Sequence, residues 1–444
     1  MITSRTVEDL ALFDRKILPN LIPFLYEEGI LVLTGSGQVG KTSLMFLLIR
    51  HLLREGIPAR NLFYIDLEDP AMLDRLNAGV QELLYFLESQ EADLSEQNFV
   101  FLDEIQYLDH PSPFLKLIAD HHPKIKLVVS GSSSFELKRK FRDSLSGRKV
   151  VFEILPLDFL EFLRFKGEDV LRRWVERYTI TQMRSGGVQP DPHVLSFHSE
   201  ALGRLFEEYA VFGGYPKTAR MQSERAKIAY LTDVYQSYAR KDIKDLAHIE
   251  HIGAFNRLLR ILGLQIGQLA NLHELTNTVG VSRETLQRYL FLLENTYVVK
   301  MLPPHFTNRR KELTKMSKVF FPDPGLRNAI VGNFDRLHER IDAGQVMENA
   351  VFSQLLKNLG PLEDVAFWRT HAKSEVDFIL RGKTLVPLEV RYRPFRKPEL
   401  PSGLRAFLNK YPSQAPAFVA TKDFLGQTLV NGTMVWFVPC WLIG

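Results

Sequence analysis

The stretch ILVLTGSGQVGKTSLMFLLIRHLL, residues 30–53, is the most informative part of this 444-residue chain. It begins with the apolar run ILVLT and ends in an apolar pattern of helical period, so it predicts a strand, a turn and a helix. The turn fits G-x-x-x-x-G-K-[ST], the pattern of a phosphate-binding loop. Glycines let backbone N–H groups curl around phosphates, and the helix N-terminus adds its positive dipole. The stretch therefore predicts a nucleoside triphosphate site.

Two interpretations of this turn are open. In the first, Lys41 neutralises phosphate charge, the Thr42 hydroxyl ligates Mg²⁺, and ATP is the ligand. In the second, the overlapping pattern G-x-G-x-x-G binds a dinucleotide, but the Lys-Thr pair argues against it, and the nearest strand-end acid, Asp66, lies further away than the roughly 20 residues such a site requires. The expected ATP-binding residues are Gly35, Ser36, Gly37, Gln38, Val39, Gly40, Lys41, Thr42 and Ser43.

Length and composition set the frame for the rest of the chain. At about 150 residues per domain, 444 residues suggest about three domains. The composition, 45% hydrophobic and 24% charged residues, is that of an ordinary globular protein. The net charge of +4 neither indicates nor excludes a basic surface. The single cysteine, Cys440, excludes disulfide scaffolds and zinc fingers. With no targeting segment and no apolar run long enough to cross a bilayer, we expect a cytoplasmic protein without a membrane partner.

Further apolar runs follow the loop at 62–67, 98–104, 125–131 and 149–155, with helical patterns between them. Strands this uniformly apolar predict an α/β fold, a P-loop parallel sheet covered by helices on both faces. The run NFVFLDE ends in Asp103, expected to hold Mg²⁺ through water, and Glu104, expected to polarise the attacking water. Because the run at 62–67 intervenes, the arrangement is typical of additional-strand ATPases.

The remainder changes character twice. Residues 156–242 have helical periodicity, residues 255–300 carry three short helical patterns, and strand patterns return beyond 319. We therefore expect a helical lid, a helix-turn-helix unit and a separate C-terminal α/β unit after the ATPase core. The expected boundaries are 1–158, 159–245, 246–318 and 319–444.

Residues 269–302 predict two helices joined at Gly280, followed by an extended segment. Ser282 can cap the second helix, whose N-terminal part carries basic and amide side chains, as docking in a DNA major groove requires. A basic run between Lys300 and Lys318 would form the wing and meet phosphates. A packing or subunit-contact module is the alternative interpretation. The candidate DNA-binding residues are Arg283, Gln287, Arg288, Arg309, Arg310 and Lys311.

Several ordered motifs then carry a specific resemblance. They are SGSSS (130–134), DSLSGR (143–148), VVFEILPLDFLEF (150–162), FGGYP (212–216), YARKDI (238–243), KVFFPDPGLRNAI (318–330), VMENAVFSQL (346–355) and EVDFIL (375–380). With them the chain resembles, over nearly its whole length, the prokaryotic AAA+ ATPases that carry a C-terminal winged helix and a nuclease-like domain of unknown function. Gln38 departs from that family, which usually has an arginine there.

The resemblance implies two further catalytic residues. Ser132 would be the polar sensor of the γ-phosphate, and Arg148 the arginine that stabilises transferred charge. A plain surface arginine is the alternative for Arg148. An arginine acting across subunits would require a ring, so we expect a homo-oligomer and leave open whether Arg148 acts within its own subunit.

Three C-terminal acids, Glu348, Asp377 and Glu389, resemble the metal ligands of the PD-(D/E)xK nuclease fold. The lysine of that motif is replaced by Arg391, which hardly deprotonates and is a poor base. Lys373 or Lys383 would have to take its role. The domain is therefore expected either to cleave DNA with a metal or to persist as a DNA-binding or structural platform.

These patterns lead to three hypotheses. The first is an ATP-hydrolysing AAA+ protein that couples nucleotide state to DNA binding or remodelling. The second is a nucleotide-gated signalling or interaction switch of the STAND type, whose helix-turn-helix contacts protein. The third is an ATP-regulated, metal-dependent DNA nuclease.

Overall fold

A computed structural model describes residues 10–131, 145–187, 192–238, 251–306, 315–412 and 415–444 of the chain. The chain divides into two compact units, Met1–Leu155 and Pro156–Gly444. Each is described by itself. Four residues with expected roles, Ser132, Arg309, Arg310 and Lys311, lie outside the described residues.

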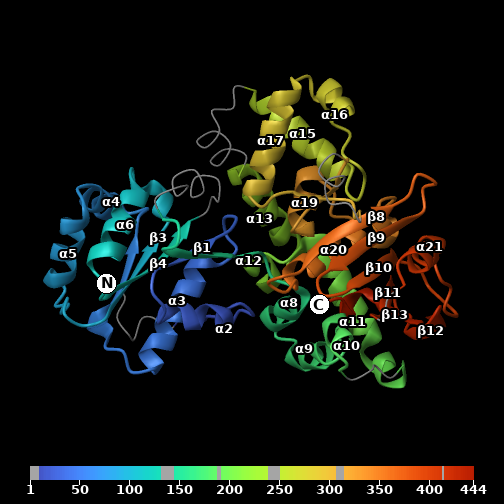
Figure 1. Ribbon diagram of the computed structural model, residues 1–444, viewed down its shortest axis with the longest axis horizontal. Helices are drawn as coiled ribbons and strands as arrows, with labels where there is room; N and C mark the ends of the chain where they lie inside the picture. The colour runs from blue at the N-terminus through green and yellow to red at the C-terminus, as the bar shows by residue number, and fades with distance from the viewer. Residues whose placement is uncertain (1–9, 132–144, 188–191, 239–250, 307–314, 413–414) are drawn as a thin grey trace. The chain divides into compact units, whose positions relative to one another are not determined.

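The first unit is built on a parallel sheet in the order β2-β3-β4-β1-β5 (Figure 1). All of its strand pairs are parallel. Strand β1 precedes the phosphate loop, and strand β3 ends in Asp103. Strand β4 lies between them in the sheet, so β1 and β3 are not neighbours. The expected additional-strand arrangement is confirmed. The strands are β1 Ile30–Thr34, β2 Leu62–Asp66, β3 Asn98–Asp103, β4 Ile125–Gly131 and β5 Lys149–Glu153.

Helices cover both faces of this sheet, which explains why β1, β3 and β4 are buried along their whole length. Side chains alternate between the faces of a strand. Val32 and Val129 accordingly share one apolar cluster with α5 and α6, while α3 lies on the other side (Figure 1). The helices are α2 Leu18–Leu21, α3 Lys41–Arg54, α4 Pro70–Asn77, α5 Val80–Ser89 and α6 Pro111–His121.

The second unit opens with helices, as the periodicity of residues 156–242 predicts. Asp158 starts the first of them with a reciprocal capping box to Glu161. No helix among the described residues is long and apolar enough to span a bilayer. The helices are α8 Phe159–Lys166, α9 Asp169–Glu176, α10 Ile180–Arg184, α11 Pro192–Phe212, α12 Pro216–Arg220 and α13 Glu224–Ser237.

The middle of this unit holds three more helices and a two-stranded antiparallel ladder. Helices α15 (Ile252–Leu264), α16 (Leu272–Val279) and α17 (Arg283–Asn295) match the three predicted helical patterns. Strand β6 (Lys300–Leu302) follows α17 and pairs with β7 (Lys318–Phe320). The order is therefore helix, turn, helix and β-hairpin.

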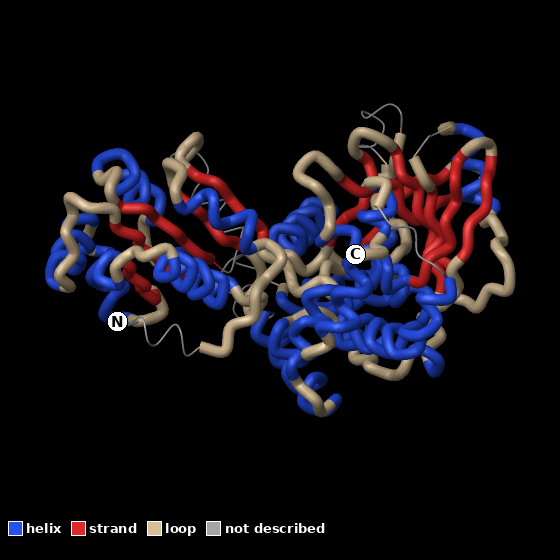
Figure 2. The backbone as a smooth tube through the Cα atoms, turned by 90° about the horizontal axis from the view of Figure 1, so that it is seen from below, coloured by secondary structure: helices blue, strands red, loops and turns tan. Residues whose placement is uncertain are grey.

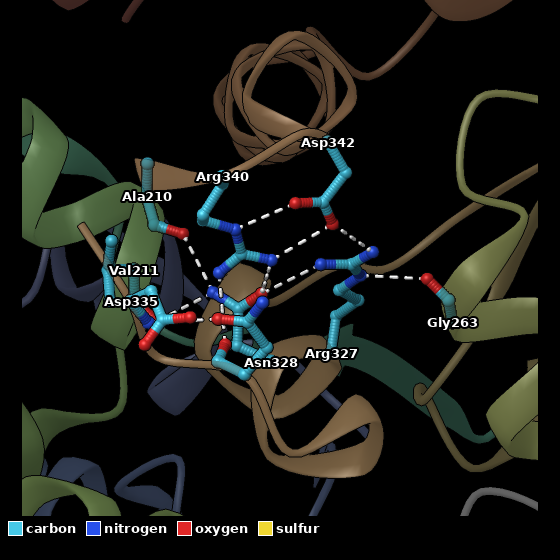
Figure 3. Close-up of polar contacts among 9 residues, drawn as sticks. Ala210, Val211, Gly263, Arg327, Asn328, Asp335, Arg340 and Asp342 are labelled. Carbon is cyan, nitrogen blue, oxygen red and sulfur yellow. Dashed lines mark hydrogen bonds and ion pairs between the residues drawn. The ribbon is translucent and has the colours of Figure 1, made fainter. Parts of the chain in front are cut away.

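A buried polar hub ties α11 and α15 to α19, Pro324–Val331 (Figure 3). Arg327, 1% exposed, donates to the carbonyl of Gly263 and to Asp342. Asn328 donates to the carbonyls of Ala210 and Val211. These are the R and N of the motif PDPGLRNAI, so this motif has a structural role in joining helices.

The unit ends in a six-stranded mixed sheet in the order β12-β13-β11-β10-β9-β8, whose strands lie side by side in Figure 2. Phe378 and Ile379 face opposite sides of it: Ile379 packs with α21, and Phe378 with Phe352 of α20. Strand β12 alternates half-buried and exposed residues at the edge, and the sequence did not predict it. The elements are α20 Ala343–Lys357, β8 Asp364–Arg369, β9 Glu375–Arg381, β10 Leu385–Arg391, α21 Ser402–Lys410, β11 Ala417–Thr421, β12 Gly426–Val430 and β13 Thr433–Pro439.

Candidate functional site

The phosphate loop lies at the carboxyl end of β1, between Thr34 and the start of α3 at Lys41. Gly40 has φ 95°, a left-handed conformation that favours glycine. At Gly35 an added Cβ would lie 2.2 Å from the carbonyl oxygen of Ile154, so no side chain fits there. The predicted strand, turn and helix are confirmed, and backbone geometry accounts for two of the loop's glycines.

Lys41 lies folded over this loop and is only 4% exposed. Its Nζ donates to the carbonyl oxygens of Gly35 at 3.1 Å and Ser36 at 3.0 Å. An incoming phosphate would compete with these neutral carbonyls for the ammonium, and the charged partner forms the stronger hydrogen bond. The Lys41 ammonium is thus held where it can exchange its carbonyl partners for a phosphate oxygen. Gln38, by contrast, is exposed, with φ 65°.

Thr42 and Asp103, predicted to share a metal, meet in the structure. The Thr42 hydroxyl donates to Asp103 Oδ2 at 2.6 Å, and the Tyr64 hydroxyl donates to the same oxygen at 2.9 Å. Ser130, at the end of β4, holds the other oxygen, Oδ1. A threonine hydroxyl and a carboxylate are oxygen ligands of the kind Mg²⁺ prefers. The residues fit a magnesium ion at this edge of the sheet.

Glu104 follows Asp103 at the same edge, in a left-handed conformation with φ 56°. Its backbone N–H donates to Asp103 Oδ1 and to the Ser130 hydroxyl, which fixes the turn. Its own carboxylate accepts a hydrogen bond from the Gln106 side-chain amide. The Gln106 amide therefore occupies one oxygen of the Glu104 carboxylate.

Sequence reasoning missed Tyr64, Ser130 and Gln106. Tyr64 packs on Phe46 of α3, with ring centroids 4.8 Å apart, and burial followed by the charge of Asp103 raises the pKa of its hydroxyl. A polar tyrosine in the apolar strand LFYID was the available signal. Ser130 opens the SGSSS motif, from which Ser132 had been chosen.

Arg148 lies at the amino-terminal ends of the strands, opposite the end that carries the phosphate loop. Its carbonyl accepts from the N–H of Ile30, the first residue of β1, whereas the phosphate loop follows the last residue of that strand. Five strand residues separate the two ends by about 16 Å. Its Nε pairs with Asp120 Oδ1 at 2.6 Å, which lowers the pKa of that carboxyl. The structure does not bring Arg148 to the phosphate loop of its own unit.

The helix-turn-helix candidate has the local geometry its sequence suggests. Gly280 ends α16 with φ 76°, and the Ser282 hydroxyl caps α17 by accepting from the Thr285 N–H at 3.1 Å. Leu286, Leu290 and Leu293 are buried, while the side chains on the opposite face of α17 are exposed. The exposed set includes the three predicted DNA-contacting residues of this helix, Arg283, Gln287 and Arg288.

The three C-terminal acids converge from neighbouring elements. Glu348 comes from α20, Asp377 from β9 and Glu389 from β10. Burial and then the charge of Asp377 raise the pKa of Glu348 to about 8 and of Glu389 to about 9. Arg391 pairs with Glu389. In the part of the chain that the structure describes, no three metal-ligating side chains are placed to hold a metal ion together.

The lysine beside these acids is Lys318, which sequence reasoning assigned to the wing. Its Nζ lies 2.6 Å from Glu375 Oε1, 3.4 Å from Glu348 Oε1 and 4.0 Å from Asp377 Oδ1. Lys373 and Lys383, the two lysines considered from the sequence, are both exposed. The signal for Lys318 was weak because the residue lies 30 positions before the first acid.

Three family models match separate parts of the chain. Residues 27–163 match a family described as an AAA domain, and residues 203–337 and 343–443 match two families described as domains of unknown function. A Haemophilus influenzae protein described as uncharacterized is 24% identical over 96% of this chain and 97% of its own length. A second, from Methanocaldococcus jannaschii, is 26% identical over 85% of this chain and 76% of its own length.

Two solved structures are similar at a distance. The Walker-type ATPase of Pyrococcus abyssi has a TM-score of 0.43 and 16% identity, covering 73% of this chain and 96% of that one. The RuvB Holliday junction branch migration motor of Thermotoga maritima has a TM-score of 0.31 and 16% identity, covering 70% and 95%. Likenesses at this level assign no activity. The match over residues 27–163 and the geometry of the phosphate loop together show that the chain carries an AAA-type ATPase domain.

Proposed function

We propose that the chain binds ATP with Mg²⁺ and hydrolyses it at the phosphate loop. The observation that carries this proposal is the convergence of Lys41, Thr42 and Asp103, with the Thr42 hydroxyl 2.6 Å from the Asp103 carboxylate. Phosphoryl transfer needs positioning and charge stabilisation more than covalent chemistry, and these side chains supply both. Bound Mg²⁺ would neutralise charge on the phosphate oxygens.

Each residue then has a defined task. The Lys41 ammonium would leave the carbonyl oxygens of Gly35 and Ser36 and pair with phosphate, while Thr42 and Asp103 would hold the metal. Glu104 orients the attacking water and accepts its proton. The Gln106 amide occupies Glu104 Oε2, so it competes with the attacking water for that carboxylate and slows hydrolysis.

We also propose that Arg148 acts across a subunit interface. The arginine lies about five strand residues from the loop of its own unit, too far to reach a bound phosphate there. A role in stabilising transferred charge therefore requires a second copy of the chain. We therefore expect a homo-oligomer, up to a ring, which mass photometry with and without ATP would detect.

We propose DNA as the partner of the second unit. The exposed Arg283, Gln287 and Arg288 lie in the first six residues of α17, the part of a recognition helix that reaches base edges. The β6–β7 hairpin after α17 occupies the place of a wing, and its connecting segment is basic in sequence. We therefore propose the domain order ATPase core, helical lid, winged helix and C-terminal α/β domain.

A salt series of DNA-stimulated ATP hydrolysis tests this coupling. We expect duplex DNA to raise turnover of the full chain by an amount that falls as salt rises, and the double variant Arg283→Ala/Arg288→Ala to lose that stimulation at every salt concentration because its base-edge contacts are removed. Arg257→Ala, an exposed arginine on the neighbouring α15, is the matched control. Equal stimulation of both variants would contradict the DNA assignment.

A nucleotide-gated switch is the second candidate, and the hydrogen bond from Gln106 to Glu104 favours it. A restrained glutamate would let the chain hold ATP for long periods and signal through its conformation. Slow single turnover with tight nucleotide retention and no response to DNA would support the switch over the DNA-coupled ATPase.

A further inference from the structure

Strand β7 belongs to two parts of the second unit at once. Its main chain lies in the small sheet beside the helix-turn-helix, where Lys318 pairs with Leu302 of β6 on one side and forms a bridge with Leu269 on the other. The side chains of Lys318 and Phe320, two residues apart, point to the same side of β7. Both contact the C-terminal domain: Lys318 lies beside Glu348 and Glu375, and Phe320 lies beside Phe352 and Phe378.

The Lys318 ammonium is a buried cation among carboxylates. The side chain is 4% exposed, and Nζ lies 2.6 Å from Glu375 and 3.4 Å from Glu348. Asp377 Oδ1 lies 4.0 Å from the same nitrogen, so the cation is compensated by acidic side chains inside the protein.

The carboxylates around it already have partners in the chain. Glu375 pairs with Lys318 and, through its other oxygen, with Arg369 at 3.4 Å. Asp377 Oδ2 accepts the N–H of Val390 at 2.8 Å. Glu389 pairs with Arg391. A divalent ion at these acids would have to displace cations held at ion-pair distance.

The resemblance to PD-(D/E)xK nucleases implies a metal at these acids, and the residues present do not fit one. We infer that Lys318 takes the place of that metal, and that the carboxylate cluster is an ionic anchor, not a nuclease centre: it fixes the helix-turn-helix to the C-terminal sheet. This inference does not depend on ATP hydrolysis at the phosphate loop.

Neighbouring contacts support an anchoring role. Phe320 stacks on Phe352 of α20, with ring centroids 4.6 Å apart, and its ring packs at a tilt against Phe378 of β9, with centroids 5.4 Å apart. The N–H of Gly267 donates to the carbonyl of Val319. A Cβ added at Gly267 would lie 3.1 Å from a Glu348 oxygen, which shows how closely this segment packs on the cluster. The cluster thus joins β7, α20, β9 and the segment that precedes α16.

The first test measures metal binding by the nucleotide-free full chain. In a Mn²⁺ titration followed by electron paramagnetic resonance, we expect wild type and Asp377→Asn to bind the same amount of Mn²⁺. A Mn²⁺ ion bound by wild type and lost in Asp377→Asn would overturn the inference. So would Mn²⁺-dependent DNA cleavage by wild type that Asp377→Asn abolishes. This arm does not depend on any Lys318 variant folding.

The second test measures the anchor itself. Lys318→Met leaves buried carboxylates without their cation, and we expect the melting temperature to fall by about 8 °C. We also expect faster amide exchange in residues 267–270 and 300–302. Lys315→Met, an exposed lysine three residues earlier, is the control and should shift melting by less than about 1 °C. A melting temperature and exchange pattern unchanged in Lys318→Met would refute the anchor.

Discussion

Replacing Tyr64 by phenylalanine should weaken the magnesium site while sparing the fold. The change removes only the hydroxyl that donates to Asp103 Oδ2 at 2.9 Å, and it keeps the ring that packs on Phe46. Asp103 retains the hydroxyls of Thr42 and Ser130, so its position loosens without being lost. A hydrogen bond to a charged group contributes about 1.5–3 kcal/mol, and the half-buried position of Tyr64 favours the lower end.

About 1.5 kcal/mol corresponds to roughly tenfold. We expect the free Mg²⁺ concentration for half-maximal ATP hydrolysis to rise about tenfold in Tyr64→Phe, a cost within the range seen when partners of metal ligands are removed. The assay is phosphate release at constant ATP over a series of free Mg²⁺ concentrations. Tyr85→Phe, on α5 and 56% exposed, is the matched control. A Mg²⁺ dependence of Tyr64→Phe within twofold of wild type would show that the Tyr64 hydroxyl does not support the magnesium site.

Three other changes have defined outcomes. Gln106→Ala frees the Glu104 carboxylate, so basal ATP turnover measured without DNA should rise several-fold; unchanged turnover would argue against restraint. Ser282→Ala removes the cap of α17 and should cost about 1 kcal/mol in urea unfolding, with a cost near zero counting against the cap. Burial raises the pKa of Asp342, but its two arginine partners outweigh burial and lower it from 3.8 to about 2. The carboxylate therefore stabilises the fold above pH 4 by about 2 kcal/mol, and this is lost as pH falls through 2. The stability gap between wild type and Asp342→Asn should shrink over that range; a constant gap would contradict the assignment.

The core of the first unit could be read from the sequence because local patterns decide it. The glycines of the phosphate loop are required by the backbone geometry at the end of β1. Asp103 and Glu104 lie at the carboxyl end of β3, and the apolar run of that strand predicts its burial. Parallel strands bring such ends together at one edge. The intervening run at 62–67 was enough to predict the additional strand.

Residues that act through partners distant in sequence could not be read in the same way. Tyr64 meets Asp103 across 39 positions, and Lys318 meets Glu348 across 30. Nothing in the local pattern of either residue identifies its partner, since the pairing depends on sheet order and on which strand face is covered. The placement of Arg148 at the amino-terminal ends of the strands likewise follows from the register of β5 with β1.

ATP hydrolysis with Mg²⁺ at the phosphate loop is tested most directly by phosphate release from ATP, measured for the purified full chain beside Lys41→Ala under identical Mg²⁺ and protein concentrations. We expect turnover by the wild-type chain that falls to background in Lys41→Ala, because the ammonium held by the loop carbonyls is the charge that receives the phosphate. Absence of turnover in wild type, or equal turnover in both proteins, would contradict it.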